Sequence, residues 1–205
     1  SEPTAGRVAN YTYAYRSMPT FTNLTITGQG AGLTSGAVVE LMKFTVAADS
    51  KGPVSLKQLR FNTNITDGGT GSSPTMNTFT FFRGSTNITT SVAIIDNAGN
   101  SFESTTTTLT ESNASDVYVV FDTEEVIPAG TTYTYTLKGT PSGFINASGD
   151  VDSISTSISE DTVPSDGTAD GGAVGENQTG FYLNASATTG VVQTLESTAG
   201  TDDGA

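Results

Sequence analysis

The sequence contains no cysteine, no histidine and no tryptophan. Without cysteine the fold has no disulfide bonds, and without cysteine or histidine the usual ligands of zinc, haem and iron–sulfur clusters are missing. Acid–base chemistry would fall to carboxylates alone. These absences argue against an enzyme, and we expect no catalytic residue, no metal site and no cofactor.

Three pairs of neighbouring carboxylates keep a two-carboxylate glycosidase formally open. They fall at the ends of expected strands and in expected loops, where acidic side chains are ordinarily solvated. We therefore interpret them as turn residues. The pairs are Glu124 with Glu125, Asp150 with Asp152, and Glu160 with Asp161.

Positive charge is scarce as well: 8 Lys and Arg stand against 21 Asp and Glu, giving a net charge of -13. Such a polyanion cannot offset phosphate repulsion, so nucleic acid and anionic membranes are poor partners. No apolar run approaches the ~20 residues of a membrane-spanning helix, and we expect no membrane span.

The apolar residues recur with a period of two, which predicts β-strands throughout the chain. Turn residues such as Asp-Gly-Gly and Pro-Ala-Gly separate the runs. About ten to twelve short strands with this spacing are typical of an antiparallel β-sandwich or jelly roll without substantial helix. The expected strands are residues 8–15, 20–27, 38–47, 54–62, 78–83, 89–96, 102–110, 115–121, 131–139, 151–159, 181–187 and 191–195.

Within these runs, one side of each strand is apolar. Leu59, Phe61 and Ile65 share a face, and Tyr133, Tyr135 and their neighbour Leu137 share another. We predict a single domain in three parts: an N-terminal strand or arm (1–16), the sandwich (17–195) and a flexible tail (196–205).

Residues 160–178 form an acidic, Gly-rich stretch that we predict to be a long exposed loop. Its Asp161, Asp166 and Asp170 are oxygen donors of the kind that calcium prefers. Their spacing matches no calcium-binding repeat, so a solvated loop is the favoured interpretation over a calcium site.

Sites for N-linked sugar are the clearest motif. Asn-x-Ser/Thr occurs at eight of the twelve Asn, whereas about 3.5 are expected by chance from 59 Ser and Thr in 205 residues. We expect most of these asparagines to face water and to carry glycans. They are Asn10, Asn23, Asn64, Asn87, Asn113, Asn146, Asn177 and Asn184.

The N-terminal run at 8–15 places Tyr11, Tyr13 and Tyr15 on one face of an extended strand. This strand either pairs within its own sandwich, the commoner arrangement, or is donated to the sheet of a neighbouring subunit. Donation is a head-to-tail contact that does not close on itself, so it would produce a filament.

Two stretches resemble β-sandwich modules of prokaryotic cell-surface proteins, those of surface layers, sheaths and fibres. They are "LMKFTVAADSKGPVSLKQLRF" at 41–61 and "IPAGTTYTYTL" at 127–137. The resemblance implies a scaffold with an extracellular, structural or adhesive role, and it brings no catalytic residues.

We therefore expect a structural subunit of an extracellular or cell-surface polymer, such as a pilus-like filament, a fibre or a surface layer, made of many copies and bearing covalent glycans. One alternative is a carbohydrate-binding or adhesin module with calcium in the 160–178 loop. Another is a viral capsid or tail protein with a jelly-roll fold.

Overall fold

The computed structural model describes residues 17–28, 33–71, 73–111, 115–147, 150–159 and 193–196. Among these residues the regular secondary structure is β-strand, apart from one 3-10 turn, η1 (Thr89–Ser91), and turns and irregular segments connect the strands. The prediction of an all-β, antiparallel sandwich is confirmed. The strands are β1 (Pro19–Asn23), β2 (Val39–Ala48), β3 (Val54–Thr66), β4 (Thr75–Arg83), β5 (Thr86–Asn87), β6 (Val92–Ile95), β7 (Leu109–Thr110), β8 (Ser115–Ile127), β9 (Thr132–Ser142), β10 (Asn146–Ala147), β11 (Asp150–Val151), β12 (Ser153–Ser159) and β13 (Gln193–Glu196).

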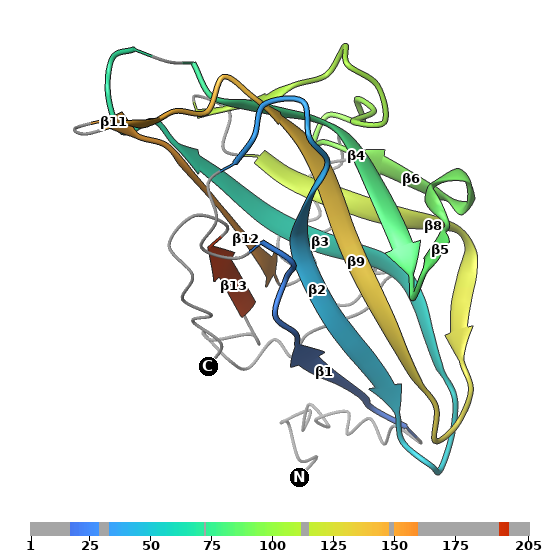
Figure 1. The fold of residues 1–205 in the computed structure, drawn as a ribbon. Coiled ribbons are helices and arrows are strands. Elements are labelled where there is room, and N and C mark those ends of the chain that lie inside the picture. Colours follow the sequence, from blue (N-terminus) through green and yellow to red (C-terminus); the bar gives the residue numbers. More distant parts are fainter. Residues whose placement is uncertain are drawn as a thin grey trace, which may run out of the picture.

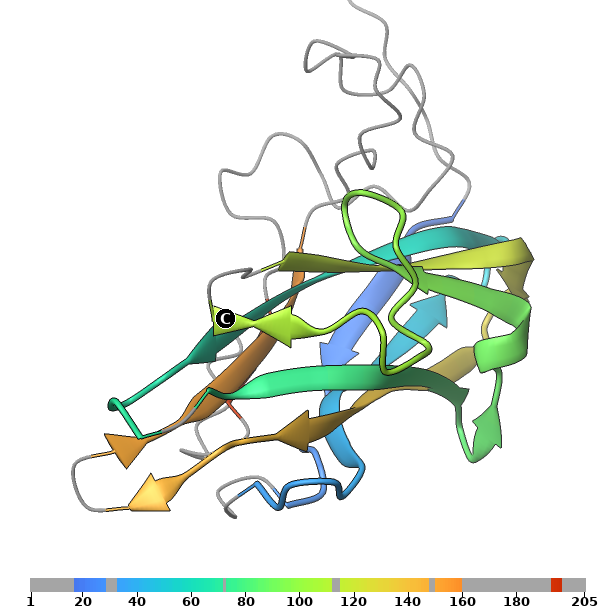
Figure 2. The same ribbon diagram turned by 90° about the horizontal axis from the view of Figure 1, so that it is seen from above.

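Two sheets make the sandwich (Figure 1). Sheet A has the order β1-β2-β9-β4-β5, with β7 also paired to β4, and sheet B has the order β13-β12-β3-β8-β6. In Figure 1, β2, β9 and β4 run side by side in front of β3 and β8, and Figure 2 gives the view from above. Strands β10 and β11 form a separate short ribbon.

Aromatic rings from both sheets fill the space between them. Phe81 of β4 stacks on Tyr135 of β9 with ring centroids 5.6 Å apart, and both are fully buried. From sheet B, Phe61 lies 6.2 Å and Phe121 lies 6.1 Å from the ring of Phe81. Phe81 therefore lies at the centre of a ring cluster that joins the two sheets.

The period-two pattern accounts for this core. On β3, Leu59, Phe61 and Ile65 are buried, whereas Asn62 and Asn64 between and beside them are exposed. The long strands each bury one apolar side because their side chains alternate across the pleat, and the apolar sides of the two sheets meet.

One irregularity of sheet B was not predicted. Strand β8 was expected to end at residue 121, but it continues to Ile127 through a bulge. Opposite it, Gln58 pairs with Val120 and Leu56 pairs with Glu125, so residues 121–124 face a single residue, Lys57. The Lys57 ammonium donates to the carbonyl of Phe121 and, at 3.3 Å, to that of Asp122, which holds the bulge in place.

Several predicted strands are wrong in part. The strand predicted for 89–96 begins only at Val92, because Thr89–Ser91 form the 3-10 turn η1. Residues 102–110 form a strand only at Leu109–Thr110, because the threonine run between Phe102 and Leu109 has no apolar side to bury. The strand predicted for 20–27 ends at Asn23. The strands predicted for 8–15 and 181–187 lie outside the described residues.

Candidate functional sites

Two of the predicted glycan acceptors lie on the outside of the sandwich. Asn64 is exposed on the outer face of sheet B, opposite Ser155 of β12. Asn87 is exposed in β5, at the end of the hairpin that β4 and β5 form. Both positions give a bulky, hydrated sugar room to extend into water.

The Asn87 site has a defined local geometry. Its Oδ1 accepts the backbone N–H of Thr89 at 2.9 Å, which closes a tight Asx turn over the three acceptor residues. The Thr89 hydroxyl oxygen in turn accepts the N–H of Phe81 at 2.9 Å. Thr89 is thus both the third residue of the acceptor motif and a link between η1 and β4.

The expectation that Asn23 points to water is wrong. Asn23 is half-buried, and it pairs with Phe44, which is fully buried and faces the core. Paired residues of antiparallel strands project to the same side, so Asn23 shares the inner side of β1 with Phe21. The alternation with Leu24 and Ile26 was misleading because the strand ends at Asn23.

Of the remaining predicted glycan acceptors, Asn146 belongs to the described residues, where it begins the short strand β10. The other acceptors, Asn10, Asn113, Asn177 and Asn184, lie outside the described residues. The three residues predicted for strand donation, Tyr11, Tyr13 and Tyr15, lie outside them as well.

Of the candidate carboxylates, Glu125 is engaged in a link between the sheets. Its Oε1 accepts from Arg83 Nη1 of β4 at 2.7 Å and from the Tyr135 hydroxyl of β9 at 3.1 Å, while Glu125 itself belongs to β8. Burial raises the pKa of the Tyr135 hydroxyl well above its usual value, and the charge of Glu125 acts in the same direction. The hydrogen bond with Glu125 raises the pKa of the Arg83 guanidinium. Tyr135 therefore remains a neutral donor and Arg83 a cation.

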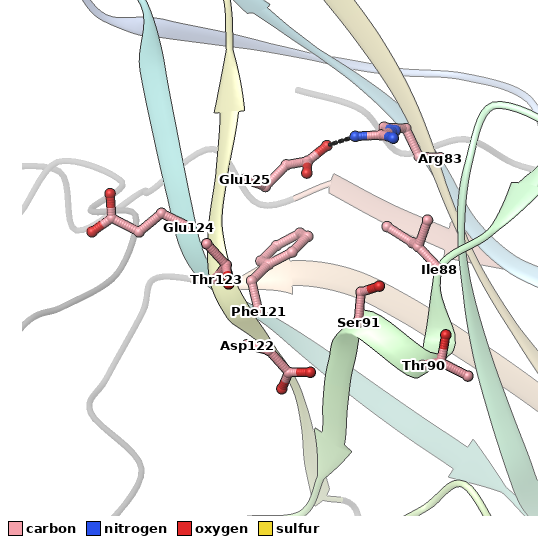
Figure 3. Close-up of a pocket in the computed structure, with 9 residues that line it drawn as sticks. All are labelled: Arg83, Ile88, Thr90, Ser91, Phe121, Asp122, Thr123, Glu124 and Glu125. Carbon is pink, nitrogen blue, oxygen red and sulfur yellow. Dashed lines mark hydrogen bonds and ion pairs between the residues drawn. The ribbon is translucent and has the colours of Figure 1, made fainter.

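A groove of about 450 Å³ runs beside this link, between the β8 bulge and the η1 segment (Figure 3). Its rim carries hydroxyls and carboxylates, and Phe121 and Ile88 contribute its apolar lining. Figure 3 shows Glu124 pointing away from Glu125, so the two neighbouring carboxylates do not converge on one point. Of the residues that line the groove, the sequence singles out only the pair Glu124 and Glu125, which it predicts to be turn residues.

Asp152 is the other candidate carboxylate with described contacts, and it is 2% exposed. Its Oδ1 accepts the N–H of Gly68 at 3.0 Å and its Oδ2 accepts the N–H of Ile145 at 2.7 Å. A Cβ on Gly68 would lie 2.2 Å from the carbonyl oxygen of Val151, so only glycine fits there. Asp152 is placed to join three chain segments.

Among the described residues, no three acidic side chains are grouped so as to hold a metal ion. The same residues include no helix long and apolar enough to cross a membrane. No protein-family model matches the chain, and a search of curated proteins finds no match either.

Proposed function

We propose that the protein is a structural subunit of an extracellular polymer, a filament, fibre or surface layer, and that it carries N-linked glycans. The observation that carries the proposal is that Asn64 and Asn87 lie on the outside of the sandwich. The carboxylates of Asp152 and Glu125, by contrast, are bound to the protein's own backbone and side chains. The excess of acceptor motifs and the resemblance to cell-surface modules point the same way.

The outer face of sheet A supports a structural role. Thr22, Thr45 and Thr134 lie in one row across β1, β2 and β9. Threonine favours strands because its branched side chain packs well on a pleated surface, and its hydroxyl keeps that surface wettable. A threonine-rich face of this kind stays hydrated, which suits a subunit that is exposed to water and must not aggregate.

Assembly is proposed to proceed through residues 8–15, whose three tyrosines would cover the sheet of a neighbouring copy. The test is deletion of residues 1–16. Loss of polymers with a monomer that keeps its strand signal in circular dichroism supports donation. Global unfolding of the truncated chain would show that the segment belongs to its own sandwich.

Glycan attachment is tested by mass spectrometry of the protein from its native source. Glycopeptides at Asn64 and Asn87 are expected, and an unmodified mass of 21.0 kDa would refute the proposal. Asn64→Asp and Asn87→Asp should each remove one glycan, since an aspartate cannot be the acceptor. The matched variant Asn23→Asp should leave the glycan mass unchanged because Asn23 faces the core side of β1.

A carbohydrate-binding module is the second candidate, and the groove favours it. Its hydroxyls and carboxylates above an apolar lining are the kind of surface that binds the polar edge and flat face of a sugar. A glycan array with the wild-type chain and Asp122→Ala tests this, since Asp122 lines the groove. Binding that survives the substitution would place the sugar elsewhere.

A further inference from the structure

A short segment joins the edges of the two sheets on one side of the sandwich. This segment, residues 100–103, is the strap. The N–H of Phe102 donates to the carbonyl of Ile94 in β6 at 2.9 Å, and the Phe102 carbonyl accepts the N–H of Phe79 in β4 at 2.9 Å. Phe102 is 2% exposed, and its ring lies 5.2 Å from that of Phe79. The strap thus occupies the place of an edge strand.

The strap is a poor substitute for a full strand. The N–H of Ile94 is bound by a side chain, the Glu103 carboxylate, at 3.1 Å. The strap pairs with β6 through a single β-bridge, between Ile95 of β6 and Ser101 of the strap. A regular neighbouring strand would instead offer backbone groups along the whole of β6.

Backbone strain marks the other attachment of the strap. Thr78 has φ +48, in the left-handed region that a β-branched residue rarely adopts. The conformation belongs to a bulge between Asn77 and Thr80 that turns the N–H of Phe79 toward the strap. Strain of this kind persists where the surroundings enforce it and is often found at switching segments.

The segment 8–15 of a second copy has the properties of a replacement. It has period-two alternation, it offers aromatic side chains on one face for the position of Phe102, and its backbone can pair along β6. Only Arg16 lies between this segment and Ser17, so residues 8–15 stay close to β1 of their own copy.

Topology favours a second copy over the same molecule. Strand β1 is at one edge of the order β1-β2-β9-β4, and the strap contacts β4 at the other side. The two lie on opposite sides of the sandwich in Figure 1. The segment before β1 would have to cross the molecule to reach its own β6.

We propose that β6 is the acceptor edge of the polymer, and that residues 8–15 of a second copy pair with it in the place held by the strap. This rests on the proposed function. The strap keeps the edge covered in the monomer, where an open edge would pair indiscriminately.

A disulfide lock tests the proposal. The Ile95→Cys/Ser101→Cys variant joins two paired positions, whose Cα atoms lie about 4.5–5.5 Å apart, within the range that a disulfide spans. The chain has no other cysteine, so the bond is unambiguous. Assembly of the full-length chain is followed by light scattering and negative-stain electron microscopy, with and without reductant.

The oxidised variant should be folded and should assemble at least tenfold more slowly than wild type. After reduction, the same variant should assemble at the wild-type rate. Wild type, which lacks cysteine, should respond to neither condition and serves as the matched control. If the oxidised variant polymerises at the wild-type rate, β6 is not the acceptor edge, but the proposed function as a polymer subunit still holds. If wild type itself forms no polymer, the proposed function fails, and the acceptor edge with it.

Discussion

The adjacent residues Phe81 and Phe82 offer a sharp test of the core, because they carry the same side chain on opposite faces of β4. Phe81 is fully buried and contacts rings from both sheets. Phe82 is half-buried on the outer face, where the Lys138 ammonium lies 4.5 Å from its ring centroid. The comparison therefore separates core packing from strand propensity.

Phe81→Ala removes a buried ring, for which about 3–5 kcal/mol is typical, and the upper half of that range is expected because three aromatic partners lose a contact. Phe82→Ala should cost only about 1 kcal/mol, from one cation–π contact and partial burial. Phe81→Leu, which keeps an apolar side chain, should fall between them.

The assay is equilibrium unfolding in urea, followed by circular dichroism. With a slope of about 2 kcal/mol/M, a loss of ~4 kcal/mol moves the midpoint down by about 2 M, whereas Phe82→Ala moves it by about 0.5 M. Equal shifts for the two alanine variants would refute the assignment of Phe81 to the centre of the core.

Three further substitutions test two polar contacts and one close backbone approach. Burial would raise the pKa of Asp96, but hydrogen bonds from Asn100 and neighbouring amides outweigh it and lower the pKa. The stability from Asp96 is therefore full above its unfolded pKa of about 4 and is lost as the pH falls through the lower folded value. Wild type and Asp96→Asn should differ in urea midpoint at pH 7, and the difference should shrink as the pH is lowered below the unfolded pKa. Gly68→Ala should cost at least about 2 kcal/mol in the same assay, since its Cβ would overlap the backbone of Val151, and a neutral result would contradict that packing. Glu125→Gln should cost about 1 kcal/mol or less because Arg83 is partly exposed, and the difference should shrink in ~1 M NaCl; a salt-independent loss would contradict an ionic contribution.

The alternation of apolar residues was sufficient to predict the all-β sandwich and most of its strands, but not the order of the strands in the sheets. On β3, Leu59 and Phe61 face the core as expected, because the pattern and the pleat share one period. The bulge in β8 could not be predicted in this way, since its cause is a contact from Lys57 on another strand. Propensity also failed for the segment after Phe102, where threonines suit a strand but bury nothing.

The candidate sites show the same difference between what local alternation predicts and what depends on contacts between strands. Exposure of Asn64 followed from the alternation around it, whereas Asn23 was misplaced because the end of β1 depends on pairing with β2. The groove beside Arg83 and Glu125 is lined by side chains from β4, η1 and β8. Because β8 is far from the other two in sequence, no local sequence pattern could predict the groove.

The buried carboxylate of Asp152 has a consequence for the dynamics of the loops it joins. The amides of Gly68 and Ile145 lie outside the strands, where backbone hydrogens ordinarily exchange with solvent faster than those of core strands. Because both donate to one buried acceptor, their deuterium uptake should be as slow as that of neighbouring strand residues. These turns would then open together with the body of the sandwich, and a protease would find them resistant despite their irregular backbone.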